Sequence, residues 1–147
     1  MIINVNENNI IMAAEIHSIS WKKSHESICT KEFIDLHTTQ HQKMYLCDEI
    51  NMGKCLYMLI EDKAVGIVSV LESLMENLYI LPEEQRKGYG SRLLEFAIQQ
   101  CKEIPTLWIL ESNYVAYSLY SKYGFQKTGI YHKLSDTLSE IEMKRAI

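Results

Sequence analysis

The sequence predicts a mixed α/β fold in which one sheet is flanked by helices. Short apolar runs with the length and spacing of strands alternate with stretches that repeat apolar residues at helical intervals. One apolar strand runs into a glycine-bearing turn and then a helix, between Ile80 and Leu94. A chain of 147 residues, 47% hydrophobic and 23% charged, has the usual size and composition of one globular domain. We therefore expect a single domain over residues 1–147.

The N-terminal third predicts a strand followed by helices. Met1 to Val5 is a short apolar run that suits an edge or near-edge strand, and the asparagine-rich residues 6–9 suit a helix cap. The first helix is marked by a stripe at helical spacing: Ile10, Ala13, Ala14, Ile16, His17, Ile19 and Trp21. His17 and Trp21 either line a pocket or belong to the packed core. Residues 27–51 suit one or two further helices.

Two histidines of this region have a spacing that metal sites also use. His37 and His41 stand four residues apart, so they share one face of a helix. The residues between them, Thr38, Thr39 and Gln40, lack the glutamate of a metalloprotease motif. The sequence therefore favours a solvated or hydrogen-bonded histidine pair, and we expect no metal.

The middle of the chain predicts an antiparallel hairpin and a third strand. Cys55 to Ile60 is apolar, residues 61–63 form a charged turn, and residues 64–71 return as the second strand. The third strand spans residues 74–81. Strict alternation places Leu74, Glu76, Leu78 and Ile80 on one face and Met75, Asn77 and Tyr79 on the other. Glu76 then stands among apolar neighbours, either at the wet end of the strand or in a cleft where it could accept a proton from an amine.

The C-terminal half continues as helix, strand, helix and two strands. Residues 93–101 form an amphipathic helix that ends near Lys102, and Thr106 to Leu110 is a strand. A second helical stripe ends at Gly124, because glycine is a common helix stop. Residues 125–132 and 138–143 are then two closing strands, with residues 144–147 as a short tail. The second stripe comprises Val115, Ala116, Leu119, Tyr120 and Tyr123.

The turn at residues 85–91, which we call the cradle, has the features of a phosphate-binding site. Gly88, Gly90 and Ser91 let backbone amides crowd together at the start of a helix. Such unpaired amides, aided by the helix dipole, attract phosphate oxygens without many basic side chains. The cradle is not a P-loop, because no GxxxxGK[ST] is present, and Leu93 replaces the third glycine of a dinucleotide fingerprint.

Net charge and cysteine content limit which binding partners and which cellular location we expect for the protein. A formal net charge of -4 argues against nucleic acid as the main partner and mildly favours a cationic acceptor. The cysteines form no CxxC pair and no signal peptide precedes them, so we expect reduced thiols in the cytoplasm. No apolar run approaches the length of a membrane span, so no membrane partner is expected.

Two motifs, taken together, resemble those of the GNAT superfamily of acyl-CoA-dependent N-acyltransferases. Gln85-Arg86-Lys87-Gly88-Tyr89-Gly90 resembles the family pattern of strand, (Gln/Arg)-x-x-Gly-x-(Gly/Ala) and helix. The stretch from Asn113 to Phe125 resembles Asn-x-x-Ala-x-x-Leu-Tyr-x-Lys-x-Gly-Phe. The order of elements also matches over essentially the whole chain, in the N-terminal third by pattern alone. The resemblance implies a twisted, mostly antiparallel sheet of about six to seven strands, flanked by about four helices and splayed at its central strands.

The resemblance implies acetyl-CoA as the donor, without excluding a longer acyl chain. Its pantetheine arm would lie along Leu78, Tyr79 and Ile80 through backbone hydrogen bonds, as an added strand would. Amides of the cradle would hold the diphosphate, and Lys122 could reach a ribose phosphate. Asn113 resembles the family asparagine that contacts the cofactor, and it suits a helix cap equally well. The cradle residues are Gln85, Arg86, Lys87, Gly88, Tyr89, Gly90 and Ser91.

The same resemblance implies catalytic roles. Tyr120 stands where the family places the tyrosine that protonates the departing thiolate, and the alternative is a core tyrosine. Many family members with an assigned base carry a glutamate at the position of Leu74, which is aliphatic here. The base is then Glu76 or water, with Glu72 and Glu111 as further candidates.

The acceptor is expected to be a primary amine that attacks acetyl-CoA directly. In the family the acceptor site is built from the first two helices and the later strand loops, which implies an aromatic surface suited to a small amine or the end of a peptide or protein. A monomer or homodimer is expected. The alternative is a non-catalytic acyl-CoA-binding or regulatory module, which would need no proton donor. The acceptor-pocket candidates are His17, Trp21, His25, Phe33, Tyr45 and Tyr131.

Overall fold

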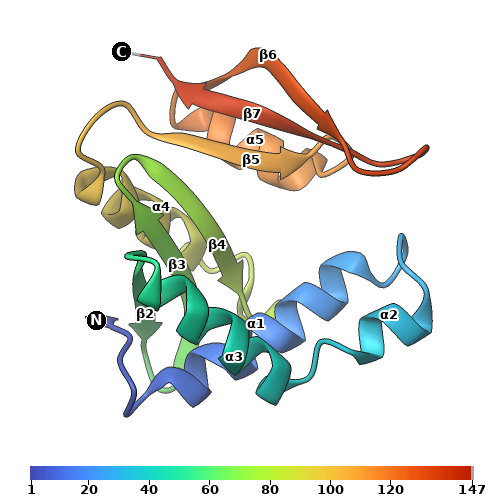
Figure 1. Cartoon of the computed structure of the whole chain (residues 1–147). Helices are drawn as coiled ribbons and strands as arrows, with labels where there is room; N and C mark the ends of the chain where they lie inside the picture. Colours follow the sequence, from blue (N-terminus) through green and yellow to red (C-terminus); the bar gives the residue numbers. More distant parts are fainter. Residues whose placement is uncertain (147) are drawn as a thin grey trace.

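One sheet of seven strands runs through the molecule in the order β1-β2-β3-β4-β5-β7-β6, which confirms the predicted mixed, mostly antiparallel architecture (Figure 1). This computed structural model describes residues 1–146. The strands are β1 (Ile2–Asn4), β2 (Cys55–Ile60), β3 (Ala64–Leu71), β4 (Leu74–Ile80), β5 (Thr106–Leu110), β6 (Phe125–Lys133) and β7 (Ser139–Arg145). The helices are α1 (Ile10–His25), α2 (Lys31–Asp35), α3 (Thr39–Asn51), α4 (Tyr89–Gln100) and α5 (Tyr114–Lys122), with a 3-10 turn, η1, at Pro82–Glu84.

The N-terminal helices begin at local hydrogen bonds. Thr30 and Thr38 cap α2 and α3, because their side-chain oxygens accept hydrogen bonds from backbone amides in the first turn. The predicted asparagine cap of α1 is different in detail. Asn6 accepts from the amide of Asn8 and Asn9 accepts from the amide of Asn6, so these asparagines fold the turn before α1, and Asn9 makes no side-chain cap.

β4 departs from strict alternation in its centre. Its register with β3 shifts so that two residues of β4, Asn77 and Leu78, lie opposite one residue of β3. Asn77 has φ +55°, a left-handed conformation that asparagine tolerates better than most side chains. This is a β-bulge, and one extra residue reverses the faces of the residues that follow it.

The predicted faces of β4 are therefore wrong from the bulge onward. Leu78 and Ile80 pack into the same core cluster as Met75, which strict alternation places on the opposite face. Tyr79 packs into the other cluster. The extra residue inserted at Asn77 is the physical reason, because alternation is correct only where the ladder is regular.

The sheet divides between β4 and β5. These strands run parallel and pair over a short stretch, with Leu74 opposite Thr106 and Met75 opposite Leu107. Beyond that point the two strands separate, as Figure 1 shows, which confirms the predicted splay. The carboxyl half of β4 thus has no neighbouring strand on its β5 side, and its backbone is available to a ligand.

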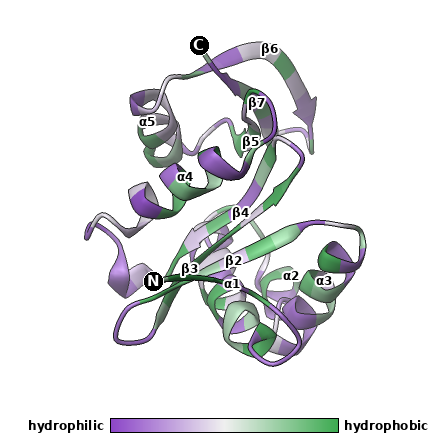
Figure 2. Cartoon of the chain, turned by 90° about the vertical axis from the view of Figure 1, so that its left-hand side faces the viewer, coloured by the Kyte–Doolittle hydropathy of each residue, from purple (hydrophilic) through white to green (hydrophobic). Residues whose placement is uncertain are grey.

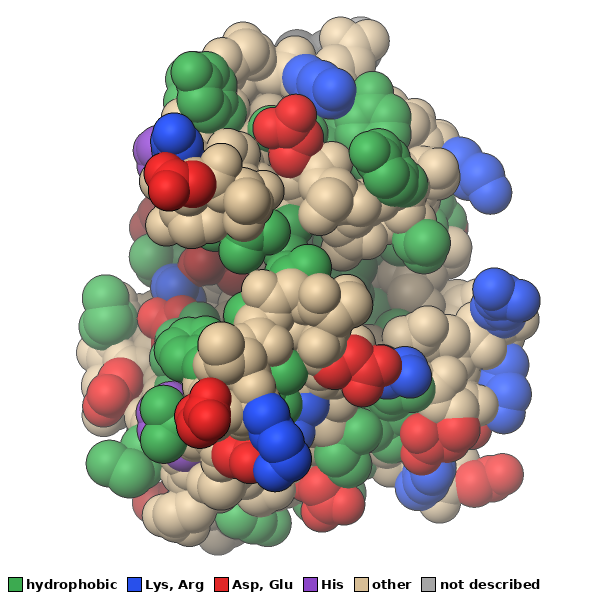
Figure 3. Space-filling model, turned by 90° about the vertical axis from the view of Figure 1, so that its right-hand side faces the viewer, with side chains coloured by type: hydrophobic (Ala, Val, Ile, Leu, Met, Phe, Trp, Pro, Cys, Tyr) green, Lys and Arg blue, Asp and Glu red, His purple; other side chains and the backbone are tan. Residues whose placement is uncertain are grey.

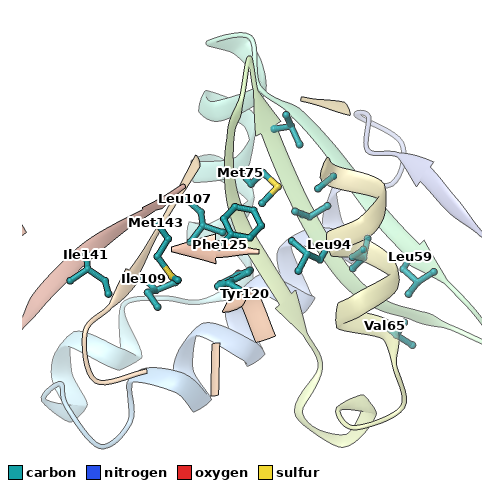
Figure 4. Packing of buried hydrophobic residues seen from close by; sticks show 14 residues of the cluster. Leu59, Val65, Met75, Leu94, Leu107, Ile109, Tyr120, Phe125, Ile141 and Met143 are labelled. Atoms are coloured by element: carbon teal, nitrogen blue, oxygen red, sulfur yellow. The ribbon is translucent and has the colours of Figure 1, made fainter. Parts of the chain in front are cut away.

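Helices cover the two faces of the sheet unequally. The helices α1, α2 and α3 lie on one face, and α4 and α5 lie on the other (Figures 1 and 2). The α4-side core contains Met75, Leu94, Leu107 and Met143, and so it crosses from one half of the sheet to the other (Figure 4). A second cluster, the α1-side core, joins α1 and α3 to β2 and β3. The two halves are therefore held together beneath the splay.

Close packing of α4 on the sheet depends on one glycine. A Cβ atom at Gly66 would clash with the side chain of Ile80, lie 2.9 Å from Leu93 Cδ1 and lie 3.0 Å from the Tyr79 carbonyl oxygen. Because Gly66 has no side chain, the first turns of α4 can approach β3 and β4 closely. This contact fixes the position of the cradle relative to β4.

The chain closes with β6 and β7, and the predicted tail is partly wrong. β7 continues through Arg145, whose Nε donates to the Tyr123 carbonyl oxygen (2.8 Å). Charged residues of β7 alternate with buried Ile141 and Met143. The last residues of the strand, Lys144 and Arg145, are both charged, so the sequence pattern did not indicate that the strand continues through them. Gly124, with φ +88°, ends α5 as predicted. Residue 147, the last of the predicted tail, lies outside the described residues.

Candidate active site

The cradle follows β4 directly and leads into α4. Arg86 (φ +65°) and Gly88 (φ +87°) both adopt left-handed conformations, which turn the chain so that α4 begins at Tyr89. Within the described residues, no backbone amide from 86 to 91 donates a hydrogen bond. The next amide, that of Arg92, bonds to the Gly88 carbonyl oxygen (3.1 Å). The cradle therefore presents a row of unpaired amides at the positive end of a helix.

The space in front of the cradle is open. A Cβ atom at Gly88 would meet no atom within 4 Å, and one at Gly90 would meet only Ile80 Cγ1 and Leu119 Cδ2, both at 3.8 Å. Gly88 is therefore not required by packing against the protein, although its left-handed backbone favours glycine. Unpaired amides that face open space fit a diphosphate group.

Basic side chains surround the cradle, although not all of them are free. Lys87 Nζ pairs with Glu84 (3.0 Å). Arg86 and Lys122 are exposed and form no ion pair among residues 1–146. Gln85 Nε2 donates to the Ile80 carbonyl oxygen (3.3 Å), so this side chain braces the turn. Figure 3 shows lysine and arginine side chains along one edge of the hollow between the two halves of the molecule.

Tyr120 reaches from α5 into the α4-side core near the splay (Figure 4). Its ring is 8% exposed and lies edge-on to Phe125, with 5.7 Å between the ring centroids. Burial, with a smaller contribution from Tyr79, raises the pKa of the Tyr120 phenol well above its usual range. No hydrogen bond to its hydroxyl is found in the described part of the chain. A protonated phenol without a protein partner can donate to a substrate atom.

Asn113 begins α5, as its structural alternative predicted. Its Oδ1 accepts a hydrogen bond from the amide of Ala116 (3.1 Å). The residue is exposed, and its Nδ2 group donates no hydrogen bond within the described residues. Its capping role therefore leaves one polar group for a ligand.

Glu76 lies where β4 and β5 begin to separate and shares a lysine with a second glutamate. Lys54 Nζ donates to Glu49 Oε1 (2.7 Å) and to Glu76 Oε1. The Lys54 side chain is 10% exposed. Burial lowers the pKa of Lys54, but the hydrogen bonds and charges of the two glutamates outweigh burial and raise it. Lys54 is therefore charged, and it joins Glu76 of β4 to Glu49 of α3.

The other two candidates for the base occupy different ends of β4 and β5. Glu72 lies in the turn between β3 and β4, beside the closed end of the splay, and is 3.6 Å from Lys102 Nζ. Glu111 follows β5 at the open end and is exposed. Geometry thus favours Glu76 and Glu111 over Glu72, because the acceptor must reach the point where the strands have separated.

Three acceptor-pocket candidates form one aromatic stack on the α1 side of the sheet. The Trp21 ring lies between His25 (4.1 Å between centroids) and His37 (3.5 Å), with Phe33 edge-on at 5.8 Å. Burial lowers the pKa of His25. His37 Nδ1 donates to the Phe33 carbonyl oxygen (2.9 Å), and His41 is also hydrogen-bonded, as the sequence favoured.

The remaining candidates lie elsewhere. Tyr45 packs beside His17, with ring centroids 5.4 Å apart. His17 is 3% exposed, so it belongs to the interior. Tyr131 is exposed on β6, in the other half of the sheet. The predicted pocket is therefore not one continuous group of residues.

The sequence model of the acetyltransferase (GNAT) domain family matches residues 51–127, which is more than half of the chain. The chain belongs to the GNAT acetyltransferase family. The matched stretch runs from the end of α3 into β6 and includes the cradle, Glu76 and Tyr120. No match was found among curated protein sequences.

Solved GNAT structures share the whole fold. PaiA N-acetyltransferase from Thermoplasma acidophilum, in complex with coenzyme A, is 19% identical with a TM-score of 0.72, over 100% of this chain and 98% of that one. YncA from Salmonella typhimurium, with its cofactor acetyl-CoA, is 18% identical (TM-score 0.71; 98% and 91%). Ribosomal-protein-alanine N-acetyltransferase from Brucella melitensis is 14% identical (TM-score 0.70; 100% and 99%). At these identities the likeness shows the fold.

Several residues around the site of this GNAT domain were not predicted from the sequence. Lys54 and Glu49 look like ordinary surface charges, because nothing in their local pattern announces a buried ion pair. Asn77 was a weak local signal, since asparagine is depleted in strands and tolerates a left-handed backbone better than most residues. Within residues 1–146, no helix is long and apolar enough to cross a membrane, and no group of three or more His, Cys, Asp or Glu is arranged to hold a metal.

Proposed function

We propose that this protein transfers an acetyl group from acetyl-CoA to a primary amine of a small molecule or of a protein, by direct attack in a ternary complex. The observation that carries this proposal is the row of unpaired amides at residues 86–91, which faces open space at the start of α4. A buried phenol beside the splay adds a proton donor to this binding site. Membership of the GNAT family supports both assignments.

The donor is proposed to bind along the unpaired side of β4. Because β5 has separated there, the edge of Leu78, Tyr79 and Ile80 that faces away from β3 is open to the amides of the pantetheine arm. The Ile80 carbonyl oxygen on this edge already accepts from Gln85 Nε2 and Ser20 Oγ, so a ligand would share or replace those hydrogen bonds. The cradle amides hold the diphosphate, and Arg86 and Lys122 contribute positive charge at its edge. Asn113, Lys87 and the other cradle residues complete the proposed donor site.

The proposed transfer begins with attack by the neutral amine on the thioester carbonyl carbon. A carbon–nitrogen bond forms, the carbon–sulfur bond breaks, and the sulfur leaves as a thiolate. Tyr120 donates its phenolic proton to that thiolate, and the phenolate then recovers a proton from water. Burial keeps the Tyr120 phenol in its protonated form, so the proton to be donated is present at neutral pH. The raised pKa also makes the phenol a weaker acid, so it gives up the proton only to a thiolate that lies directly beside it.

We assign the proton released by the amine to Glu76, directly or through a water molecule. Lys54 supports the assignment by holding the Glu76 carboxylate where β4 and β5 separate. The same ion pair occupies Glu76 Oε1, so water is the alternative acceptor of this proton. Glu111 is a third possibility on the open side.

Two kinds of acceptor are compatible with the cleft. The Trp21 stack offers aromatic surface beside α2, and the net charge of -4 favours a cationic amine. A fold relative is named as a ribosomal-protein-alanine N-acetyltransferase, which supports keeping protein amines among the candidates. A non-catalytic acyl-CoA-binding module remains the second candidate function, since the cradle alone would serve it.

The test is incubation of the purified protein with acetyl-CoA and a panel of polyamines, amino acids and peptides with free N-termini. All four cysteines are free, so loss of the thioester absorbance and the mass of the acetylated product are followed in place of thiol reagents. Acetylation of at least one amine supports the proposal. Acetyl-CoA binding without any acetylated product favours the binding module, and absence of binding refutes both functions.

A further inference from the structure

The bulge of β4 is held by side chains from three other elements. Asn77 Oδ1 lies 3.2 Å from His17 Nε2 of α1 and 3.5 Å from the Tyr45 hydroxyl of α3. Asn77 Nδ2 donates to Ser69 Oγ of β3 (3.2 Å). The Ser69 hydroxyl in turn donates to the carbonyl oxygen of Glu76, the residue before the bulge (3.1 Å). A left-handed backbone that costs free energy is thus fixed through its own side chain.

His17 is buried, at 3% exposed. Its Nδ1 accepts a hydrogen bond from Gln42 Nε2 (2.7 Å), because a side-chain amide nitrogen can only donate. The proton of the neutral ring is therefore on Nε2, which donates to Asn77. Burial lowers the pKa of His17 to about 4, so the ring is neutral at physiological pH. Gln42 is fixed in turn by His41 Nδ1, which donates to Gln42 Oε1 (2.6 Å).

The bulge decides which side chains of β4 face each side of the sheet. With it, Leu78 and Ile80 pack into the α4-side core, and Tyr79 packs into the α1-side core. Without it, alternation would reverse these three residues. They form the stretch of β4 along which the donor is proposed to lie.

We infer that His17 is a positioning residue of the acetyl-transfer site: its hydrogen bond to Asn77 holds the bulge, and the bulge sets the backbone of β4 that acetyl-CoA meets. The inference rests on the proposed function for its effect on acetyl-CoA, and on the contacts of Asn77 for its effect on β4. Helix α1 also reaches the other end of this stretch, where the Ser20 hydroxyl donates to the Ile80 carbonyl oxygen (3.3 Å). One helix thus holds both ends of the proposed donor strand.

His17 is better placed to hold the bulge than Tyr45 and Ser69, the other two partners of Asn77. The Tyr45 hydroxyl is at the limit of hydrogen-bonding distance, and its ring is partly exposed. Ser69 lies on the adjacent strand and accepts from Asn77, so it stabilises the side-chain amide without joining β4 to a helix. His17 alone among them links the bulge to a buried hydrogen-bonded chain through Gln42.

A double-mutant cycle tests the inference. His17→Phe removes the donor, His17→Gln keeps a neutral donor and acceptor at a similar reach, and Asn77→Gly keeps the left-handed backbone without the side chain. Acetyl-CoA affinity is measured by calorimetry. The constants kcat and KM are measured with an amine that the wild-type protein acetylates. We expect His17→Phe to weaken acetyl-CoA binding about tenfold, the effect of one buried hydrogen bond, and His17→Gln to restore most of it. In the Asn77→Gly protein, His17→Phe should change the affinity no further.

Ile16→Val is the matched control, because Ile16 neighbours His17 on α1 and lies in the α1-side core. It should lower the melting temperature and leave the acetyl-CoA affinity unchanged. An equal effect of His17→Phe with and without Asn77 would overturn the inference, because His17 would then act by packing. So would a His17→Phe protein with wild-type affinity.

A second measurement separates this inference from the proposed function. The Cα chemical shift of residue 77 reports its left-handed backbone in the protein without acetyl-CoA. We expect His17→Phe to move this shift away from the left-handed range, and His17→Gln to leave it in place. If the wild-type protein neither binds acetyl-CoA nor transfers its acetyl group, the proposed function is refuted. The chemical shift of residue 77 then still tests whether His17 stabilises the bulge. An unchanged shift in His17→Phe refutes that hold.

Discussion

Tyr120 is a buried phenol whose protonated form is strongly favoured, and its substitution separates chemistry from binding. We expect Tyr120→Phe to lower kcat about a hundredfold with little change in the KM for acetyl-CoA, because only proton donation to the leaving thiolate is lost. The ring still packs against Phe125, so the fold should persist. Initial rates at several acetyl-CoA concentrations measure both constants.

The matched control for this substitution lies on the same helix. Tyr117 lies near Lys127 Nζ, which is 5.2 Å from its ring centroid, and it is not assigned to the active site. Tyr117→Phe should therefore keep wild-type turnover. Full turnover in Tyr120→Phe would refute the proton-donor role and leave Tyr120 as a core residue.

His17 also predicts a pH dependence of stability. Burial holds the pKa of His17 at about 4 in the folded protein, against 6.5 for an ordinary histidine. As the pH falls below 6.5, the unfolded chain binds this proton before the folded one does, so stability that is present above pH 6.5 is lost toward pH 4. The expected loss is about 3 kcal/mol in the free energy of unfolding.

Carboxylates also titrate near pH 4, so the measurement must isolate His17. Urea unfolding of the wild type and of His17→Gln is compared at about pH 7.5, 6 and 4.5, which lie on both sides of the ordinary histidine pKa. The wild type should lose more stability than His17→Gln as the pH falls. Parallel losses in the two proteins would show that His17 does not titrate as its burial requires.

At the scale of elements, the cradle predicts different roles for its two glycines. Gly88 is left-handed and faces open space, whereas Gly90 has an ordinary backbone with room for a small side chain. We expect Gly88→Val to raise the KM for acetyl-CoA tenfold or more, roughly the effect of a misplaced and obstructed amide row. Gly90→Ala should change that KM little, and Gly90→Leu should raise it.

Melting temperatures show whether these substitutions act on binding or on the fold. Gly88→Val adds backbone strain of about 1–2 kcal/mol, so a modest fall in melting temperature is expected. Gly90→Ala should leave the melting temperature unchanged, since its Cβ would make only contacts of 3.8 Å. An unaltered KM in Gly88→Val would remove the principal support for the donor site.

Elements were predictable from the sequence where local pattern and tertiary role agree. The cradle, the end of α5 at Gly124 and the hairpin of β2 and β3 follow from glycine chemistry and apolar periodicity, which act locally. The faces of β4 were not predictable by alternation, because the bulge at Asn77 depends on partners in α1 and β3 that are distant in sequence. The pairing of Glu76 with Lys54 was hidden for the same reason.

At the scale of the whole molecule, the residues of the proposed site come from both faces of the sheet. The cradle and Tyr120 belong to the α4 side, whereas Glu76 and the Trp21 stack belong to the α1 side. A donor and an acceptor can therefore approach the gap between β4 and β5 from opposite faces of the sheet. This arrangement suits direct transfer, because the two substrates meet without competing for the same surface.

A donor bound in this gap would contact both halves of the sheet, so it should stabilise the molecule as a unit. We expect acetyl-CoA at about 100 times its dissociation constant to add about 2.7 kcal/mol to the free energy of unfolding, because it binds the folded state alone. For a domain of this size the melting temperature should rise by several degrees, roughly 2–4 °C for each kcal/mol. Thermal unfolding with coenzyme A, acetyl-CoA, ATP and NAD measures the effect and its selectivity. Coenzyme A and acetyl-CoA should raise the melting temperature of the wild type more than that of Gly88→Val. An equal rise with ATP or NAD would mean that the cradle recognises a diphosphate without the pantetheine arm that β4 is proposed to bind.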